Sequence, residues 1–334
     1  MQVELAVALA LAFALTSGFH DAADAIATLV ATRAARPGQA IVLAAVFNVL
    51  GAVLFGTAVA SAVASIVDVS GDAAIAVVGS SVFAALAWNL VTWWFGLPVS
   101  SGHSLVGGLM GAGFAVGGAG AVRWGGIESG QPVGVAGVLI ALALAPIAGF
   151  IIGLFTDRVA RRALVRATAR TARPLRASQW ALSAAVGFGH GSNDAQKLMG
   201  VIAVLLVAGG YQQEFGVPLW VKVATGAALT LGTALGGWRI VRTIGTGIFR
   251  LRPIDGAASQ AGAATVLLSA SALGAPVSTT HVVTSAVVGA GGGRRRWAHI
   301  RWQVVRSIGA GWLLTLPVTA ALGAATAVVW QAIA

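Results

Sequence analysis

Two long apolar segments constrain the fold of this chain more than any other feature. Segments 41–64 and 133–155 contain no charged residue, and each is long enough to cross the roughly 30 Å hydrocarbon core of a bilayer as a helix. The chain is 57% hydrophobic and 9% charged, whereas about a quarter of the residues in a soluble domain are charged. Strands of an outer-membrane barrel would instead alternate polar and apolar residues. The sequence therefore predicts an all-α polytopic membrane protein.

The net charge of +11 does not indicate nucleic-acid binding. The basic residues are confined to short segments between apolar runs, as the positive-inside rule describes for cytoplasmic loops. A basic DNA-binding domain would not be this apolar. Because the chain has no cysteine, disulfides and thiolate metal sites are excluded. No resident metal or other cofactor is predicted.

Two motifs each occur twice, in the same order and at nearly the same separation. The sequence GFHDAADAIA from Gly18 is similar to GSNDAQKLMG from Gly191. Further along each half, GLPVSSGHSLVGG from Gly96 is similar to GAPVSTTHVVTSA from Gly274. Two ordered matches at one spacing indicate an internal duplication.

The distribution of arginines predicts how the two repeats are oriented. If arginine-rich segments are cytoplasmic, the first repeat, 1–155, crosses from outside to inside and the second repeat, 178–334, returns. Both termini are then extracytoplasmic. This is an inverted-topology repeat, common in secondary transporters. We predict roughly 10–12 transmembrane or re-entrant helices, about ten of them crossings, with a cytoplasmic connection at 156–177. The arginines of this connection are Arg158, Arg161, Arg162, Arg166, Arg170, Arg173 and Arg176.

Charged residues lie within the apolar runs, where a lipid-facing helix should carry none. Asp21 and Asp24 belong to the first motif, and Asp194 and Lys197 to the second. A charge at the bilayer centre costs at least about 2.5–3.5 kcal/mol and usually faces a cavity where it has a function. One interpretation is structural, with an Asp24–Lys197 ion pair holding the repeats in register. The other is ion binding, which the duplicated aspartate favours.

Glycines precede both aspartate motifs. Gly18, Gly189 and Gly191 permit a break in a helix, and the backbone groups freed by a break bind ions where no water competes. We therefore predict interrupted helices at both motifs, with the carboxylates as coupling-ion or proton sites. His20 and Asn193 would supply neutral ligand atoms beside them.

The motifs PVSSGH (98–103) and PVSTTH (276–281) favour anion binding. A proline followed by hydroxyl residues is typical of a helix start with a Ser or Thr cap, and the N–H groups of a helix start attract anions. Two such motifs from opposed repeats would enclose one tetrahedral oxyanion, although plain helix capping is the simpler alternative. The candidate hydroxyl ligands are Ser100, Ser101, Ser278, Thr279 and Thr280.

Three histidines accompany these motifs. His103 and His281 end the two PVS motifs, and His190 precedes the second aspartate motif. A histidine in a helix bundle is more often a packed, hydrogen-bonded residue than a ligand. Because imidazole exchanges a proton near neutral pH, each of the three is also a candidate proton handler.

The duplicated motifs resemble those of the inorganic phosphate transporter (PiT) family. The family's GxNDxANA signature is similar to GFHDAADA and GSNDAQKL, and its PVSTTH signature to 98–103 and 276–281. Over nearly the whole chain, the sequence looks most like bacterial low-affinity phosphate permeases. The resemblance implies a homodimeric, proton-coupled carrier in the bacterial cytoplasmic (inner) membrane that accepts phosphate complexed with a divalent metal. By position it implies that Asp21 and Asp194 bind the coupling ion, and that Asn193 and the five hydroxyls surround the phosphate.

Three residues depart from the family pattern. His20 and Asp24 stand where the first motif has asparagines, and Lys197 takes the corresponding place in the second motif. An ammonium repels sodium, but attracts phosphate or pairs with a carboxylate. We therefore expect proton rather than sodium coupling, with His20 and Asp24 as further coupling-ion candidates and Lys197 as a phosphate ligand.

The predicted function is import of inorganic phosphate by cation-coupled secondary transport with alternating access. Sulfate is an alternative substrate for the same fold, since it is also a tetrahedral anion. A membrane-embedded metalloenzyme with His20, Asp21, Asp24 and His190 as ligands is an alternative of another class, although no HExxH motif is present. A channel is a third alternative, but it leaves the buried charges without a coupling role. We predict a transporter with no catalytic residues.

Overall fold

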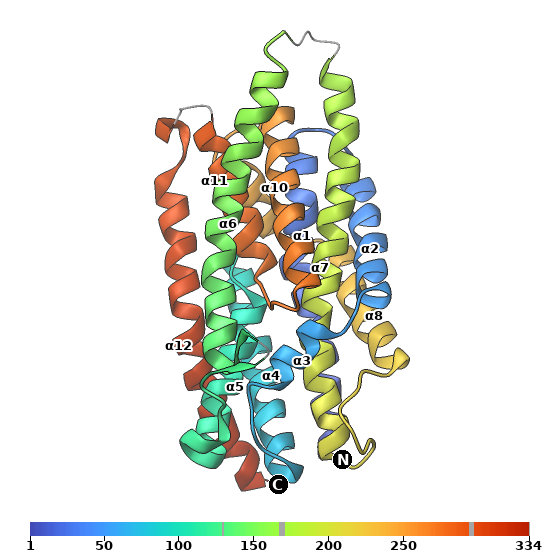
Figure 1. Ribbon diagram of the computed structural model, residues 1–334, viewed down its shortest axis with the longest axis vertical. Coiled ribbons are helices and arrows are strands. Elements are labelled where there is room, and N and C mark those ends of the chain that lie inside the picture. Colours follow the sequence, from blue (N-terminus) through green and yellow to red (C-terminus); the bar gives the residue numbers. More distant parts are fainter. Residues whose placement is uncertain (129, 167–170, 294–296, 334) are drawn as a thin grey trace.

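The structure is a computed structural model that describes residues 1–128, 130–166, 171–293 and 297–333, and it is a bundle of long helices (Figure 1). Two short strands, β1 (Gly126–Glu128) and β2 (Gln131–Val133), pair antiparallel. Short turns of other helix types are η1 (Gly118–Ala121), η3 (Thr243–Gly247) and η4 (Trp297–His299). The α-helices are α1 (Gln2–Ala31), α2 (Pro37–Leu54), α3 (Ala58–Ala64), α4 (Gly71–Trp94), α5 (Ser101–Gly117), α6 (Gly134–Ala163), α7 (Ala172–Ala208), α8 (Leu219–Leu235), α9 (Trp238–Arg242), α10 (Pro253–Ala272), α11 (Thr279–Gly293) and α12 (Trp302–Ile333).

The predicted fold class, an all-α polytopic membrane protein, is confirmed. Within the described residues, six helical segments are long and apolar enough to cross a membrane: α1, α2, α4, α5 with η1, α6 and α12. A seventh is the bent pair formed by α8 and the segment Trp238–Gly247, which meet at 62°. These six or seven are fewer than the ten predicted crossings. Three further helices do not meet this measure, since α7 is polar at its centre, α10 carries several polar residues, and α11, with 15 residues, is short.

The first helices of the two halves of the chain run in opposite directions. In Figure 1, α1 ascends from the N-terminus and α7 descends beside it, and both termini lie at the lower end. Helices also exchange partners between halves, since α1 packs on α8 while α2 packs on α7, and α5 packs on α12 while α6 packs on α11. The inverted-topology repeat itself stays a prediction.

The predicted helix breaks at the aspartate motifs are wrong. Helix α1 is continuous from Gln2 to Ala31 and α7 from Ala172 to Ala208. The glycines serve helix crossing instead. A Cβ added at Gly18 would lie 2.0 Å from the Leu229 carbonyl oxygen of α8, so these helices touch through their backbones, as small residues allow in membrane bundles.

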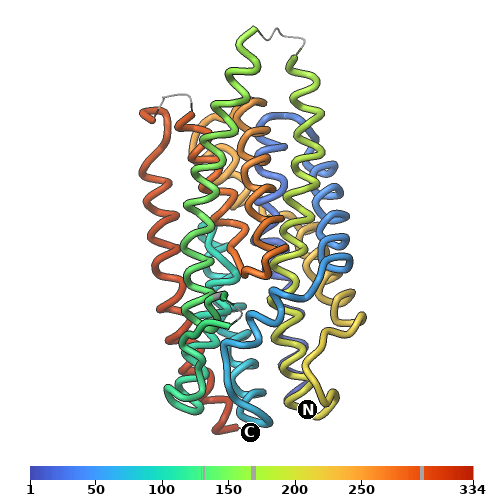
Figure 2. The backbone as a smooth tube through the Cα atoms, in the orientation of Figure 1, coloured from blue at the N-terminus to red at the C-terminus, as the bar shows by residue number. Residues whose placement is uncertain are grey.

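The breaks in the fold lie at the PVS motifs. Helix α4 ends at Trp94 and α5 begins at Ser101, while α10 ends at Ala272 and α11 begins at Thr279. Figure 2 shows the turn between α10 and α11, drawn in orange, about halfway along the molecule. Each PVS motif is therefore the tip of a helical hairpin that ends inside the bundle.

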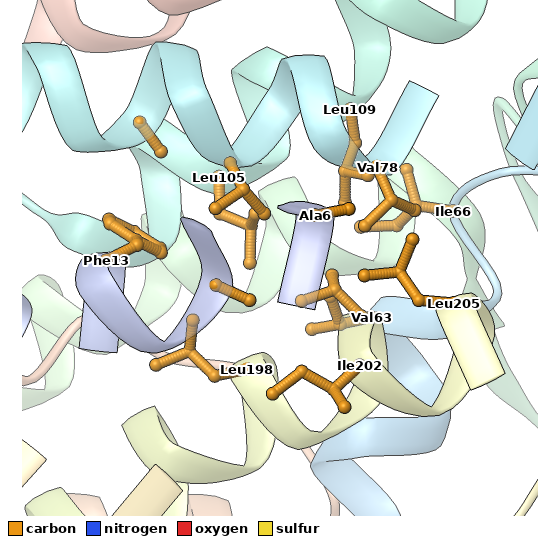
Figure 3. Packing of buried hydrophobic residues seen from close by; sticks show 14 of the residues in the cluster. Ala6, Phe13, Val63, Ile66, Val78, Leu105, Leu109, Leu198, Ile202 and Leu205 are labelled. Carbon is orange, nitrogen blue, oxygen red and sulfur yellow. The ribbon is translucent and has the colours of Figure 1, made fainter. Parts of the chain in front are cut away.

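Two apolar clusters flank the middle of the bundle. One cluster contains α1 up to Ala14 together with α5 and α7, and Figure 3 shows Phe13, Leu105, Leu198 and Ile202 among its members. The other cluster contains α1 from Ala22 onward, together with α10 and α11. The polar part of the first aspartate motif lies between these two clusters.

The arginine-rich connection is largely helical. Helix α6 continues to Ala163 and α7 begins at Ala172, at the end of the molecule opposite the termini (Figure 1). Arg161 pairs with Asp157 and with Asp255 of α10, which ties the connection to the bundle. Arg170 and the basic residues 294–296 lie outside the described residues, and the predicted repeat boundaries remain predictions.

Replacing Gly191 by Ala should destabilise the protein. The added Cβ would lie 2.0 Å from the Asn48 carbonyl oxygen of α2, and overpacking of this kind costs about 1–3 kcal/mol. We expect a lower thermal unfolding midpoint in detergent, measured by size-exclusion chromatography after heating. The control is Gly38→Ala, since a Cβ at Gly38 meets nothing within 4 Å. Equal midpoints for the two variants would contradict the close crossing of α2 and α7.

Candidate functional site

Asp21 is the point where both PVS motifs meet. The Ser101 hydroxyl donates to Asp21 Oδ2 at 2.8 Å, and the Thr280 hydroxyl lies 3.0 Å from Asp21 Oδ1. The imidazole Nδ1 of His20 lies 2.9 Å from the same Oδ1, and its Nε2 contacts the Thr92 hydroxyl at 3.2 Å. The carboxylate is 1% exposed, so these contacts replace its hydration.

Asp24 shares a hydroxyl with Asp21. The Thr280 Oγ1 lies 3.0 Å from Asp24 Oδ2 as well as from Asp21 Oδ1. Asp24 Oδ1 is buried and has no hydrogen-bond partner among the described residues. The first aspartate motif thus holds two buried carboxylates on either side of one hydroxyl group.

Asp194 forms the corresponding centre in the second half. Lys197 Nζ donates to its Oδ1 at 2.5 Å, and the Thr279 hydroxyl donates to its Oδ2 at 2.7 Å. His190 Nε2 lies 3.5 Å from Oδ2, an ion pair only when the imidazole is protonated. Lys197 also donates to the Val277 carbonyl oxygen.

The predicted Asp24–Lys197 ion pair is therefore replaced by a local one. Lys197 pairs with Asp194, three residues earlier on the same helix. It also packs on the other PVS motif, since a Cβ added at Gly102 would lie 3.0 Å from Lys197 Nζ. The ammonium thus lies between the tips of both hairpins.

Asn193 holds the second PVS loop in place. Its amide nitrogen donates to the Ala275 carbonyl oxygen at 3.0 Å and to the Ser271 hydroxyl at 3.3 Å. Its amide oxygen accepts from the Val277 backbone N–H at 3.1 Å. Both ends of this predicted phosphate ligand are therefore engaged with the loop.

The five predicted hydroxyl ligands divide into two groups. Ser100 and Ser278 cap α5 and α11, accepting from the backbone N–H of His103 at 3.0 Å and of His281 at 3.2 Å. The capping interpretation holds for these two. The other three hydroxyls bond to the aspartates, and they belong to Ser101, Thr279 and Thr280.

His103 and His281 lie against each other at the starts of α5 and α11. Their ring centroids are 4.6 Å apart, and Trp312 stacks on His281 at 3.8 Å. One ring nitrogen of each, His103 Nδ1 and His281 Nε2, is buried without a hydrogen-bond partner in the described structure. His190 lies apart from them, with its Nδ1 3.0 Å from Asn48 Oδ1.

Sequence reasoning missed several polar residues that support the site. Thr92 contacts His20, Asn48 contacts His190, and Ser271 contacts Asn193. Each is a polar residue within an apolar helix, and that feature alone marks it as a candidate partner for a buried charge. Trp312, which stacks on His281, carries no such signal.

The site carries excess negative charge. Three buried carboxylates, Asp21, Asp24 and Asp194, face one ammonium, that of Lys197. Uncompensated buried charge is costly, so the arrangement favours binding of protons or cations. In the described part of the chain, no group of three or more His, Cys, Asp or Glu residues is placed to hold a metal ion.

Comparison with known proteins identifies the family of the chain. Residues 17–323 match the phosphate transporter family. The chain belongs to this family. The match agrees with the resemblance of its duplicated motifs, and it makes the protein a multi-pass membrane transporter and not an enzyme.

Relatives cover the chain from end to end. A probable low-affinity inorganic phosphate transporter of Rhizobium meliloti (strain 1021) is 41% identical over 95% of this chain and 93% of the relative. One of the same description from Bacillus subtilis (strain 168) is 36% identical over 96% of this chain and 94% of its own length. A solved structure of a sodium-dependent phosphate transporter superposes with a TM-score of 0.84 at 24% identity, covering 100% of both chains. That likeness shows the fold.

Replacing Lys197 by Met should destabilise the protein strongly. The variant leaves the Asp194 carboxylate buried without its ammonium partner, and breaking a buried ion pair costs about 3–5 kcal/mol. We expect a lower unfolding midpoint in detergent. The double variant Asp194→Asn with Lys197→Met should recover much of the loss, because no charge is then left unpaired. A single variant as stable as the parent would show that the ammonium does not compensate Asp194.

Proposed function

We propose that the protein imports inorganic phosphate across a bacterial cytoplasmic membrane by proton symport. The observation that carries the proposal is the Thr280 hydroxyl, 3.0 Å from a carboxylate oxygen of both Asp21 and Asp24. A hydroxyl has one hydrogen to donate, so it satisfies one carboxylate and places an oxygen lone pair against the other. A proton on one carboxyl group makes both contacts favourable.

Charge balance favours symport over uniport. The site already holds two more negative than positive groups, counting Asp21, Asp24, Asp194 and Lys197. An entering phosphate anion adds further negative charge in a low-dielectric region, where repulsion is strong. Protons or other cations that enter with the anion remove this repulsion.

The contacts of Lys197 favour protons over sodium as the coupling ion. Its ammonium binds a carboxylate oxygen of Asp194 and the carbonyl oxygen of Val277, which are the ligand types that a bound cation would use. The ammonium of Lys197 therefore takes the place of a coupling cation beside Asp194. The coupling ion then binds at the Asp21–Asp24 pair. Because these two carboxylates share one hydroxyl group, a proton fits there better than a larger cation.

The anion fits between the tips of the two hairpins. Helices α5 and α11 begin there, and their N-terminal N–H groups favour negative charge. The hydroxyls of Ser101, Thr279 and Thr280 can turn from the carboxylates to the anion once protons are bound. Asn193 fixes the loop around the anion through Ala275 and Val277. Phosphate is favoured over sulfate because the relatives are named as phosphate transporters, and because hydrogen phosphate carries a proton that Asp24 can accept.

The experiment that tests the function is radiolabelled phosphate uptake into proteoliposomes. Uptake is measured with an inward proton gradient, with an inward sodium gradient and with neither, each with and without Mg²⁺ and excess sulfate. We expect accumulation with the proton gradient and no inhibition by sulfate. A requirement for Mg²⁺ would identify the metal–phosphate complex as the substrate. Accumulation of sulfate, or uptake driven by sodium alone, would overturn the proposal.

Replacing Asp24 by Asn should separate coupling from binding. The amide keeps the shape of the side chain and can still contact Thr280, but it cannot take up a proton. We expect loss of proton-driven accumulation, by about tenfold or more, while exchange of internal for external phosphate continues. Asp72→Asn is the control, since Asp72 is exposed at the start of α4. Proton-driven accumulation at the parental rate would remove Asp24 from the coupling mechanism.

A further inference from the structure

Three buried polar side chains lie beyond the central site without hydrogen-bond partners in the described structure. They are Thr28 of α1, Gln260 of α10 and Thr284 of α11, and each is at most 2% exposed. Both amide atoms of Gln260 lack partners. A buried polar group without a partner is costly, so three of them on adjacent helices require an explanation.

The two threonines differ from other buried threonines of the bundle. Thr225 and Thr315 donate to the carbonyl oxygen four residues earlier, at 2.7 Å each, as helical threonines commonly do. The hydroxyls of Thr28 and Thr284 do not bond to their own helices in this way. Their hydrogens are therefore not used by a carbonyl oxygen of their own helices.

The helix register places the three side chains at one level. Thr28 lies one turn after Asp24, and Thr284 lies one turn after Thr280. The side chains of Asp24 and Thr280 are in contact. A Cβ at Gly256 of α10 would lie 2.8 Å from the Thr32 side chain, which is one turn beyond Thr28. Since α10 runs opposite to α1 (Figure 2), Gln260 lies back at the level of Thr28. We call Thr28, Gln260 and Thr284 the polar layer.

Two cavities lined by arginine lie beyond the polar layer. One, of about 710 Å³, is lined by residues that include Arg250, Arg252 and Arg301. The other, of about 650 Å³, shares two of these arginines and adds Arg33 and Thr32. Among the described residues, no Asp or Glu lines either cavity. Both cavities are therefore positively charged, and Thr32 is one turn from the polar layer.

A thin apolar layer separates the cavities from the polar layer. Phe249 and Leu251 line the larger cavity and are 5% and 7% exposed. A Cβ at Gly291 of α11 would lie 2.9 Å from the Phe249 ring. The sequence of layers from the centre outward is thus carboxylates, neutral polar groups, two apolar side chains and arginines.

The positions that correspond to the polar layer in the other repeat are apolar. By the alignment of the two repeats, Thr28 corresponds to Val201, Gln260 to Val82 and Thr284 to Val106. These valines are 0–2% exposed and belong to the first apolar cluster.

This difference between the halves cannot come from packing needs alone. The same positions in the same fold accept valine in one half and carry polar side chains in the other. The polar side chains are therefore not required to build the bundle, and a ligand that passes between them accounts for their presence.

We propose that phosphate moves between the central site and the arginine-rich face along a path lined by the polar layer. This inference rests on the proposed function, since it names the route of the same substrate. The two hydroxyls and the amide group of the layer offer four hydrogens for donation to an anion. The layer carries no charge, so it holds the anion weakly and allows release. The arginines then stabilise the anion in the cavities, while displacement of Phe249 opens the apolar layer.

The absence of cysteine in the chain allows a direct test by thiol labelling. Gln260→Cys and Thr284→Cys are compared with the corresponding positions of the other half, Val82→Cys and Val106→Cys. The reagent is 2-sulfonatoethyl methanethiosulfonate, an anion that does not cross membranes, applied to each face in intact cells and in inverted vesicles. From the arginine-rich face, we expect Gln260→Cys and Thr284→Cys to react about tenfold faster than Val82→Cys and Val106→Cys. Inorganic phosphate should slow this reaction, and chloride should not.

Two exposed positions define the faces in this experiment. Arg162→Cys on the connection should label from the arginine-rich face, and Tyr211→Cys in the loop after α7 from the other. The proposed path would be overturned if Gln260→Cys and Thr284→Cys react no faster than the valine-position variants. It would also be overturned if they react only from the face that labels Tyr211→Cys. Labelling that phosphate leaves unchanged would overturn its assignment to phosphate. None of these outcomes depends on transport, so they remain distinct from a failure of phosphate uptake in proteoliposomes.

A second pair of variants separates a path from a structural role. Thr284→Val and Gln260→Leu replace unpartnered buried polar groups by apolar ones, so the unfolding midpoint should stay equal or rise. Phosphate uptake should nevertheless fall about tenfold or more, because the anion then crosses an apolar layer. A lower midpoint, or uptake at the parental rate, would show that the polar layer does not serve passage of the anion.

Discussion

Buried carboxylates at the centre of a membrane bundle are the constraint on which the rest of this structure depends. Asp21 and Asp194 are 1% and 3% exposed, so each requires hydrogen-bond donors from protein. Ser101 and Thr280 supply donors to Asp21, and Thr279 supplies one to Asp194. These hydroxyls reach the centre because two hairpins stop halfway across the bundle. The fold is thus arranged to bring helix starts to the carboxylates.

Backbone contact between helices follows from the same constraint. The hydroxyl donors are short side chains, so the helices that carry the aspartates must lie within a few ångströms of the hairpin tips. Gly189 permits this for α7, because a Cβ there would lie 2.9 Å from Leu267 of the hairpin helix α10, while Gly18 and Gly191 pack α1 and α7 against the backbones of α8 and α2. Small residues therefore determine the geometry of the site even though they contribute no ligand atom.

Much of this arrangement could be predicted from the sequence, and the errors have identifiable causes. The duplicated motifs predicted that Asp21, Asp194 and the PVS hydroxyls come together, because a duplication implies equivalent positions in space. The partner of Lys197 could not be predicted, because choosing between Asp24 and Asp194 requires the relative depth of two helices. The predicted break before Asp21 was wrong because a glycine in a membrane helix has two uses, interruption and close crossing, and sequence alone does not distinguish them.

The two aspartate motifs are similar in sequence but differ in charge. At the fifth position of the HDAAD and NDAQK segments of the aspartate motifs, the first half of the chain carries Asp24 and the second half Lys197. A symmetric pair of carboxylates would demand two exchangeable cations. With Lys197 bound to Asp194, the second motif is neutralised by a group that cannot leave, so in the proposed symport only the first motif gains and loses charge. The polar layer, with Thr28 from the first half of the chain and Gln260 and Thr284 from the second, lies one helical turn beyond the contact of Asp24 with Thr280. In the proposed mechanism, the carboxylates that change charge and the path by which the anion leaves therefore lie next to each other, so that protonation at the centre and opening toward the arginines can act on one side of the molecule.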